Sequence, residues 1–241
     1  MTFSIEWHDR LGSTNAYMKD RFLQDSTLGN GTVFATREQT AGRGRSDRKW
    51  LTAPDTNLCF SLFVETDVPL IEIPSLTMAA ALAVTDFLNG QNIAAAPKWP
   101  NDALVGDKKI CGVLSERVER AAGAGIIVGI GLNVNMSSEE AAAIDRPATS
   151  MLIESGTARP LSATLDALLP HLAHWIEAWR ADGFRGIRAV WTEKAGPLGK
   201  PISVRDGDRK KNGTLAGFGD HGELLLQTAT GLETIWSGDV S

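Results

Sequence analysis

The chemically richest stretch of this chain is the basic loop at residues 42–50, which combines two glycines, three arginines, one lysine and a terminal tryptophan. Glycine allows backbone conformations with positive φ, so consecutive N–H groups can turn toward a bound anion. Each guanidinium offers a planar fork of donors that fits a phosphate or a carboxylate. The indole of Trp50 offers a flat face on which a nucleotide base can stack. The loop is therefore typical of a site that holds an acid and a nucleotide together.

Two other interpretations of the basic loop stay open from its residues alone. A run of basic residues is most often a solvated surface, and Arg-Gly segments also bind nucleic acid. The whole chain, however, carries a formal net charge of -5 and has a pI of about 5.4. A general nucleic-acid binder normally shows a basic face and a high pI, so the acidic balance favours a focused anion site.

A second cluster, Lys-Trp-Pro-Asn-Asp at residues 98–102, lies between two strand-like runs. Its proline stiffens a corner that holds a cation, an amide and a carboxylate close together, at a strand end where sites are often built. The alternative is a plain proline turn with a surface Lys–Asp pair.

Lys109 begins the strand that follows. Alternation along that strand predicts that Lys109 shares a face with Cys111 and Val113. A lysine on a buried face is unusual unless it meets an anion. The alternative is a lysine whose stem lies along the strand end and whose amine reaches solvent.

A third cluster, Gly-Ile-Gly-Leu-Asn at residues 129–133, lies in an apolar strand. Glycines inside a strand indicate close approach of a ligand or of another backbone. The G-x-G-x-x-G spacing of dinucleotide-binding proteins fails at Val134, and the chain has no Walker loop and no G-x-S-x-G motif. Any nucleotide is therefore expected to bind in another way.

Composition indicates a globular protein with a sizeable core, since 43% of its 241 residues are hydrophobic. Cys59 and Cys111 both lie in apolar runs, which predicts buried free thiols in a reducing compartment. The N-terminus shows no secretory signal, and we expect no run long and apolar enough to span a bilayer. We therefore expect a cytoplasmic protein without a membrane partner.

Hydrophobic patterning predicts mixed α and β structure up to about residue 193 and a small antiparallel β unit from 194 to 241. Helices are expected over 14–23, 75–88 and 162–181, with a short one after the S-x-x-E capping box at 137–140. Strands are expected over 3–8, 32–36, 57–64, 94–98, 103–105, 110–118 and 125–134, and in the tail over 202–204, 213–216, 224–227 and 234–236.

Taken together, the clusters resemble the biotin protein ligase family. The matching residues follow one another in order and span about half of the chain. The resemblance implies an α+β fold, with a class II aminoacyl-tRNA synthetase-like mixed sheet and flanking helices over 1–193 and an SH3-like β-barrel over 194–241. The matching residues are Ser13, Thr14, Asn15, Gln39, Ala41, Gly42, Arg43, Gly44, Arg45, Arg48, Trp50, Lys98, Trp99, Pro100, Asn101, Asp102, Lys109, Gly112, and Gly129 to Asn133.

The resemblance implies a reaction in two steps. Biotin and ATP, with Mg²⁺, would give biotinyl-5′-adenylate, and the biotinyl group would then pass to a specific lysine of a biotin carboxyl carrier protein domain. Some family members carry an N-terminal DNA-binding domain, but here Ser13 stands almost at the N-terminus. We therefore expect the short form of the ligase, with no DNA partner. Two protomers can pair through an exposed strand edge.

The resemblance also implies roles for individual residues. Catalysis is expected from Lys109, Arg45 and Arg48, with Lys109 bridging the biotin carboxylate and the α-phosphate. No metal ligand is assigned, although Asn101 and Asp102 are candidates, and the basic loop is expected to close and order over the adenylate. The expected biotin-binding residues are Ser13, Thr14, Asn15, Gln39, Gly42, Arg43, Gly44, Arg45, Lys109 and Gly112. The expected ATP-binding residues are Arg45, Arg48, Trp50, Lys98, Asn101 and Asn133.

Two other functions stay open at this point. A lipoyl or octanoyl transferase has a related fold and also acylates a carrier lysine, but it is expected to lack the arginine loop that ends on Trp50. A module that only senses biotin or a nucleotide would need neither Lys109 nor the whole arginine set. Biotin-dependent exchange between ATP and pyrophosphate separates all three functions.

Overall fold

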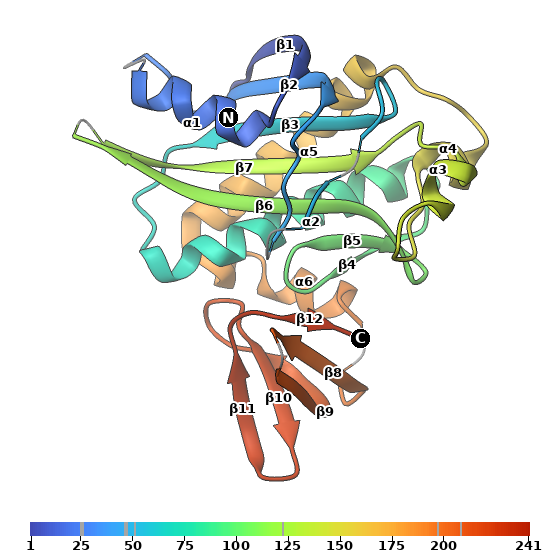
Figure 1. Ribbon diagram of the computed structural model, residues 1–241. Helices are drawn as coiled ribbons and strands as arrows, with labels where there is room; N and C mark the ends of the chain where they lie inside the picture. Colours follow the sequence, from blue (N-terminus) through green and yellow to red (C-terminus); the bar gives the residue numbers. More distant parts are fainter. Residues whose placement is uncertain (25–26, 46–47, 51, 122, 197, 208) are drawn as a thin grey trace.

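The computed structural model describes all residues except 25–26, 46–47, 51, 122, 197 and 208, and it contains two β-sheets with flanking helices (Figure 1). The large sheet has seven strands in the order β1-β2-β3-β7-β6-β5-β4, and the small one has five in the order β11-β10-β9-β8-β12. The strands of the large sheet are β1 (Ser4–Leu11), β2 (Thr32–Gln39), β3 (Asn57–Val64), β4 (Ala95–Lys98), β5 (Asp102–Val105), β6 (Lys108–Arg120) and β7 (Gly123–Asn133). The expected α+β fold class is confirmed.

The large sheet is mixed because β1 and β2 run parallel while every other neighbouring pair is antiparallel. A parallel pair needs a crossover connection, and helix α1 (Thr14–Gln24) supplies it. Ser13 stands just before this helix, as expected of its N-cap, and its Oγ lies 3.5 Å from the Ala16 amide nitrogen. The crossover therefore places the residues around Ser13 at one end of the sheet.

Helices cover the two faces of the large sheet unequally. The long helices α2 (Ile73–Gly90) and α5 (Leu161–Asp182) pack together on one face, and α1 lies on the other (Figure 1). The segment 70–90, which includes α2, is long and apolar enough to cross a bilayer, contrary to the sequence expectation, but 72% of its apolar 18-residue window is buried inside the protein. The segment is therefore the central core helix beneath the sheet.

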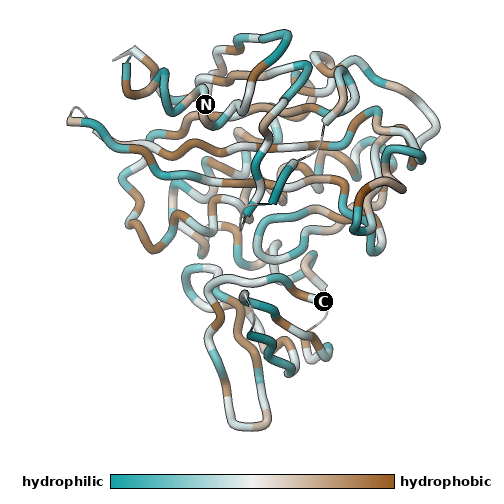
Figure 2. Tube along the Cα trace, viewed as in Figure 1, coloured by the Kyte–Doolittle hydropathy of each residue, from teal (hydrophilic) through white to brown (hydrophobic). Residues whose placement is uncertain are grey.

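The central strand β7 has one face in the hydrophobic core and the other face toward the cavity. Its side chains alternate between the faces, so that Val128, Ile130 and Leu132 lie in the same core as the residues of α2. On the opposite face Ile127 packs under α1, and Gly129 and Gly131 follow it. The hydropathy-coloured trace in Figure 2 shows the contrast between the mainly hydrophobic central strands and the hydrophilic edge strand β1. The glycines leave room above the sheet where larger side chains would fill it.

The small sheet packs against the end of the large one. Its strands are β8 (Pro201–Asp206), β9 (Arg209–Phe218), β10 (Leu224–Thr228), β11 (Gly231–Ile235) and β12 (Asp239–Val240). Its apolar residues join the main core together with Trp191 of helix α6 (Arg188–Lys194). Trp99 Nε1 also donates to the Gly222 carbonyl at 2.9 Å. Among the described residues no strand pairing joins β11 to β12, so this sheet is open.

Most of the expected elements are present, and the short ones account for the differences. The capping box at Ser137 and Glu140 is confirmed at the start of α3 (Ser138–Ala142). Helices α4 (Met151–Ser155) and α6, the single-turn 3-10 helices Leu70–Glu72 and Gly183–Gly186, and strand β12 were not predicted. Elements this short carry too few periodic positions to produce a pattern in the sequence.

Candidate active site

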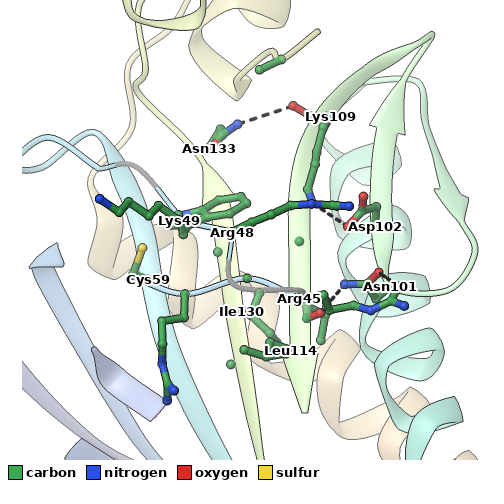
Figure 3. A pocket seen from close by; sticks show the side chains of 18 of the residues that line it. Arg45, Arg48, Lys49, Cys59, Asn101, Asp102, Lys109, Leu114, Ile130 and Asn133 are labelled. Atoms are coloured by element: carbon green, nitrogen blue, oxygen red, sulfur yellow. Dashed lines mark hydrogen bonds and ion pairs between the residues drawn. The ribbon is translucent and has the colours of Figure 1, made fainter. Parts of the chain in front are cut away.

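A cavity of about 560 Å³ lies on the face of the large sheet that also carries α1. Thirteen of the fifteen expected site residues line it, and they come from segments up to 120 residues apart in sequence. Figure 3 shows several of these side chains pointing into the same space. The expected residues along the wall are Ser13, Thr14, Asn15, Gln39, Arg43, Gly44, Arg45, Arg48, Trp50, Asn101, Lys109, Gly112 and Asn133.

One end of the cavity, here called the neutral end, is formed by Ser13, Thr14, Asn15 and Gln39, all of them buried. The Thr14 amide donates to Gln39 Oε1 at 2.9 Å, which joins the start of α1 to the end of β2. Because these groups are removed from bulk water, each unsatisfied donor or acceptor would be costly. The neutral end is therefore suited to a small polar ring that satisfies them.

Trp50 occupies the middle of the cavity and lies over two glycines. A Cβ at Gly131 would approach Trp50 Cε2 to 2.4 Å, and one at Gly112 would approach Trp50 Cζ3 to 3.1 Å. The backbone of the basic loop sets this position, because the Trp50 amide donates to the Gly42 carbonyl at 2.9 Å. The two glycines therefore make room for the indole, so that a side chain, and not the ligand or backbone expected from the sequence, approaches Gly131 closely.

Lys109 points into the cavity, but the predicted strand register around it is wrong. A bulge pairs Leu104 with Lys109 and Ala103 with Cys111, which reverses the alternation at this point. The Lys109 amine consequently lies 2.9 Å from where a Cβ on Gly112 would be, whereas Cys111 is in the core. Lys109 therefore shares a face with Gly112 and not with Cys111 and Val113.

The amine of Lys109 has two neighbours in the cavity. It donates to Asp102 Oδ1 at 2.6 Å (Figure 3), and it lies 5.6 Å from the centre of the Trp50 ring. The ion pair with Asp102 holds the amine in place. Lys109 is therefore a fixed cation at the centre of the cavity.

The other end of the cavity, here called the charged end, joins the basic loop to the small sheet. Arg48 forms a bidentate ion pair with Asp239 of β12, and Arg146 lies 3.6 Å from the same carboxylate. Arg45 donates to Asn101 Oδ1 at 3.1 Å (Figure 3) and to the Gly238 carbonyl at 3.4 Å. The small sheet therefore contributes an acid to a site that is otherwise built on the large one.

The charges at this end shift one another's proton affinities. Burial lowers the pKa of Arg45, an effect that Asp239 partly opposes. The hydrogen bond to Asp239 raises the pKa of Arg48. Burial would raise the pKa of Asp239, but the hydrogen bond and charge of Arg48 outweigh it, so the pKa of this carboxyl is lowered. Arg48 and Asp239 therefore favour each other's charged form.

A strap at residues 143–148 closes the remaining side of the cavity. It is fixed to the strand that carries the central lysine, because the Lys109 amide donates to the Pro147 carbonyl at 2.9 Å. Asn133 Nδ2 donates to the Thr149 carbonyl at 2.9 Å and so holds the same segment from β7. Asn133 thus positions the strap as well as lining the cavity.

Two expected site residues lie outside the lining of the cavity. Gly42 stands behind it, and a Cβ there would come within 2.5 Å of Gln39 Nε2 and 2.6 Å of the Trp50 carbonyl oxygen. In β4, Ala95 and Pro97 are buried on one face of the strand, and Lys98 lies on the other face with the exposed Ala96. Lys98 therefore does not line the cavity. The structure therefore gives no support to Lys98 as a ligand-binding residue.

Sequence reasoning missed other parts of the wall. Asp239 and the strap give no motif, and only the folded chain brings them to the basic loop. Cys59 also lines the cavity, and its burial raises the pKa of the thiol to about 12, an effect that the neighbouring Trp50 opposes. Cys59 and Cys111 are both buried and free, as predicted, and burial likewise raises the pKa of Cys111. Neither thiol is reactive in this state.

Metal binding by side chains alone is not supported in the part of the chain that the structure describes, since it holds no group of three His, Cys, Asp or Glu residues that could bind an ion. Asp102 does line the cavity, with Lys109 beside it. A magnesium ion usually takes one or two carboxylates and completes its shell with water and substrate phosphates. The donor set therefore fits Mg²⁺ only as an ion that arrives with a nucleotide.

Comparison with known proteins identifies the class to which this fold and cavity belong. The model of the Biotin/lipoate A/B protein ligase family matches residues 7–133, which is more than half of the chain. The model of the Biotin protein ligase C terminal domain matches residues 198–241. The chain belongs to the biotin/lipoate A/B protein ligase family.

Named ligases match along nearly the whole chain. The biotin–[acetyl-CoA-carboxylase] ligase of Paracoccus denitrificans is 34% identical, over 96% of this chain and 97% of that protein. The bifunctional ligase/repressor BirA of Bacillus subtilis is 31% identical, over 97% of this chain and 72% of that protein. The solved biotin protein ligase from Aquifex aeolicus in complex with biotin and ATP has a TM-score of 0.77 and 28% identity, over 98% of this chain and 97% of that one.

Proposed function

We propose that this chain activates biotin with ATP as biotinyl-5′-adenylate and then transfers the biotinyl group to a lysine of a biotin carboxyl carrier protein domain. It is a biotin ligase by its family and by relatives that match it over nearly their whole length. The roles of individual residues are our proposal. One observation carries it: a single cavity joins a neutral, buried end to a charged end through one central lysine.

The neutral end would hold the bicyclic ring of biotin. The ureido group of that ring presents both donors and acceptors, which the side chains of Ser13, Thr14, Asn15 and Gln39 can satisfy. Arg43 and Gly44 would cover the ring from the basic loop, and Gly42 would hold the base of that loop against Gln39. The biotin side chain would then run along the indole of Trp50, and its carboxylate would reach Lys109.

The charged end would hold the phosphates of ATP. The cavity wall carries six cationic side chains and three carboxylates, an excess of positive charge in an acidic protein. The carboxylate of biotin and the α-phosphate repel each other, so cations must screen their approach. Lys109 stands between the two ends, and Arg45 and Arg48 stand at the charged end, as electrostatic stabilisation of the transition state requires.

The reaction would take place in two steps. A carboxylate oxygen of biotin attacks the α-phosphorus, the bond to the β-phosphate breaks, and pyrophosphate leaves. The amine of the carrier lysine then attacks the acyl carbon, and AMP leaves. That amine must first lose a proton, since the reference pKa of lysine is about 10.4. The adenylate is sensitive to water, which the basic loop and the strap would exclude.

Adenine would lie at the middle of the cavity, with Trp50 as its stacking face and Asn101 and Asn133 near the rim. Mg²⁺ would be held by Asp102 together with the phosphate oxygens, and when bound it would neutralise part of the charge on the triphosphate.

The finer features of fold and context belong to the same proposal. We assign residues 1–193 to a catalytic domain with a sheet like that of class II aminoacyl-tRNA synthetases, and residues 194–241 to an SH3-like domain. This division is supported mainly by the two family models, which match separate parts of the chain, and also by the two separate sheets. A cytoplasmic location and the absence of a DNA partner are proposed with it. Pairing of two protomers through the edge strand β1 is a prediction that sedimentation tests.

Biotin-dependent exchange of labelled pyrophosphate into ATP tests the function directly. The purified chain is expected to catalyse exchange with biotin and not with lipoate or octanoate. Exchange that depends on lipoate would identify a lipoate ligase instead. Binding of biotin without any exchange would identify a sensing module.

A further inference from the structure

A chain of hydrogen bonds runs behind the neutral end of the cavity and finishes on a carboxylate outside its wall. Asn15 Nδ2 donates to Glu116 Oε2 at 2.7 Å, and Asn15 Oδ1 accepts from Ser61 Oγ at 2.6 Å. Ser61 Oγ also lies 2.8 Å from Thr14 Oγ1. Ser61, Thr14 and Asn15 are buried, so bulk water is not available to them as an alternative partner.

The carboxylate fixes the direction of every hydrogen bond in this chain. A carboxylate only accepts, so the amide nitrogen of Asn15 must face Glu116 and its oxygen must face Ser61. The single hydroxyl proton of Ser61 is then donated to Asn15. The 2.8 Å contact between Ser61 and Thr14 can therefore be a hydrogen bond only if Thr14 donates.

Thr14 is left as an acceptor toward the cavity. Its other contact, with Gln39 Oε1, is longer at 3.3 Å, and that oxygen already accepts the Thr14 amide. With its proton given to Ser61, Thr14 Oγ1 has only lone pairs for a ligand. Gln39 is oriented by the same amide, so its Nε2 donates, and this atom lies on the side of Gly42 at the base of the basic loop. The neutral end thus has one fixed acceptor and one fixed donor.

We propose that Glu116 is a positioning residue that sets this polarity and so makes the site select a ring N–H at Thr14. The inference rests on the proposed function, because it takes the ligand to be a cyclic urea. A ring with oxygen in place of that N–H would bring two acceptors together, which a buried site rejects strongly. Glu116 touches no ligand itself and acts through Asn15 and Ser61.

Glu116 has a second contact that must be separated from this role. Its Oε1 lies 3.5 Å from Arg43 Nη2, which links β6 to the basic loop. Glu116→Ala removes both contacts. Ser61→Ala interrupts the chain of hydrogen bonds, leaves Arg43 untouched and removes only one oxygen from a β3 residue.

The test is calorimetry without ATP on the full chain, with two ligands. One is biotin, and the other is the cyclic carbamate in which oxygen replaces the ureido N–H. The wild type is expected to bind biotin about a hundredfold more tightly than the carbamate. In Glu116→Ala and in Ser61→Ala this ratio is expected to fall to about tenfold or less, because biotin weakens while the carbamate does not.

The double variant and a matched control complete the design. Glu116→Ala with Ser61→Ala is expected to give the same ratio as either single variant, since both break one chain. Glu119→Ala changes an exposed carboxylate of the same strand and is expected to keep the wild-type ratio.

Three results would overturn the proposal. Equal weakening of both ligands would mean that Glu116 has only a structural role. A ratio that falls in Glu116→Ala and not in Ser61→Ala would mean that it acts through Arg43. Additive effects in the double variant would mean that the two residues act separately. A wild-type chain that binds no biotin at all would instead refute the proposed function, and the inference with it.

Discussion

The two ends of the cavity differ in the charge and the burial of their side chains. At the neutral end and directly behind it, uncharged residues of α1, β2 and β3 form hydrogen bonds with one another and are buried. At the charged end, partly exposed arginines from the basic loop and the strap meet a carboxylate from the small sheet. The neutral end is thus assembled inside one sheet, whereas the charged end needs both.

This difference separates what each end can do. Short hydrogen bonds between buried neutral groups depend on geometry and respond little to salt. Exposed charges act over about 8–10 Å and are screened by salt. The neutral end is therefore suited to selecting one ring, and the charged end to attracting a triphosphate and releasing pyrophosphate. Lys109 lies between them and belongs to both.

The largest effect on activity is expected from a change of Lys109, which lies between the two ends. Lys109→Ala should lower the rate of biotin-dependent pyrophosphate exchange by about 10²–10³-fold, as loss of a preorganised group at the reacting charges does elsewhere. Biotin binding without ATP should weaken much less, because the ring is held at the neutral end. Calorimetry and exchange kinetics measure the two effects. Normal exchange in this variant would remove Lys109 from the mechanism.

Two glycines of β7 offer a matched pair, one beneath the neutral end and one beneath Trp50 in the middle of the cavity. A Cβ at Gly129 would lie 2.2 Å from Asn15 Oδ1, whereas one at Gly131 would lie 2.4 Å from Trp50 Cε2. Gly129→Ala should raise the Kd of biotin by about ten- to a hundredfold, through loss of the Asn15 hydrogen bonds. Gly131→Ala should displace Trp50 and mainly raise the KM for ATP.

Each variant of this pair serves as the control for the other, since both add one methyl group to the same strand. Thermal unfolding should confirm that both variants are folded. Equal effects on biotin and ATP from both changes would show that the cavity responds as one unit and would contradict the division into two ends.

A smaller effect is expected from the indole itself. Trp50→Ala should raise the KM for ATP by about tenfold, because stacking on a base contributes roughly 1–3 kcal/mol. Biotin affinity in the absence of ATP should stay close to that of the wild type. A collapse of biotin binding with unchanged dependence on ATP would assign Trp50 to the wall of the biotin pocket instead.

Much of this site could be predicted from the sequence, because its residues stand in compact motifs with distinctive chemistry. The basic loop, the Lys-Trp-Pro-Asn-Asp corner and the glycines of β7 each give a local signal, and thirteen expected residues do meet. Lys98 was misplaced because residues in one motif can alternate between two faces of a strand. The face of Lys109 was misplaced because a bulge leaves no mark in the pattern of apolar residues.

The contribution of the small sheet could not be predicted in the same way. Asp239 lies near the end of the chain in a two-residue strand and has no motif around it. Its role follows only from the packing that brings it to Arg48, nearly 200 residues earlier. Contacts between distant segments depend on the whole fold, and a single sequence carries no local trace of them.

Ligand binding is expected to slow hydrogen exchange in the basic loop by a modest factor. Its four cations repel one another, so an anion should order it. Its Gly44 amide donates to the Arg48 carbonyl at 2.7 Å, which gives a reporter outside the undescribed residues 46 and 47. Hydrogen exchange at Gly44 and Trp50 should slow by about threefold or more when biotin and ATP are added. Equal exchange in both states would contradict ordering by the ligand.

The smallest effect is expected where the small sheet meets the charged end. Asp239→Asn should raise the KM for ATP by about threefold, because Arg48 keeps its charge and loses its anchor. Biotin affinity should not change. The difference should shrink at high salt, which screens the wild-type ion pair. Asp220→Asn is the control, since it removes another arginine-paired carboxylate of the small sheet, away from the cavity.

The ion pair between Arg48 and Asp239 also predicts a pH dependence of stability. The pKa of Asp239 is lowered from 3.8 in the folded protein, so its contribution is fully present above the unfolded value and is lost as the pH falls through the folded one. The wild type should therefore melt at most about 2–4 °C above Asp239→Asn near neutral pH, the range expected for a partly exposed pair. The two melting temperatures should converge as the pH falls below about 3.8. A difference that stays constant down to acid pH would mean that the aspartate stabilises the junction by packing and not by its charge.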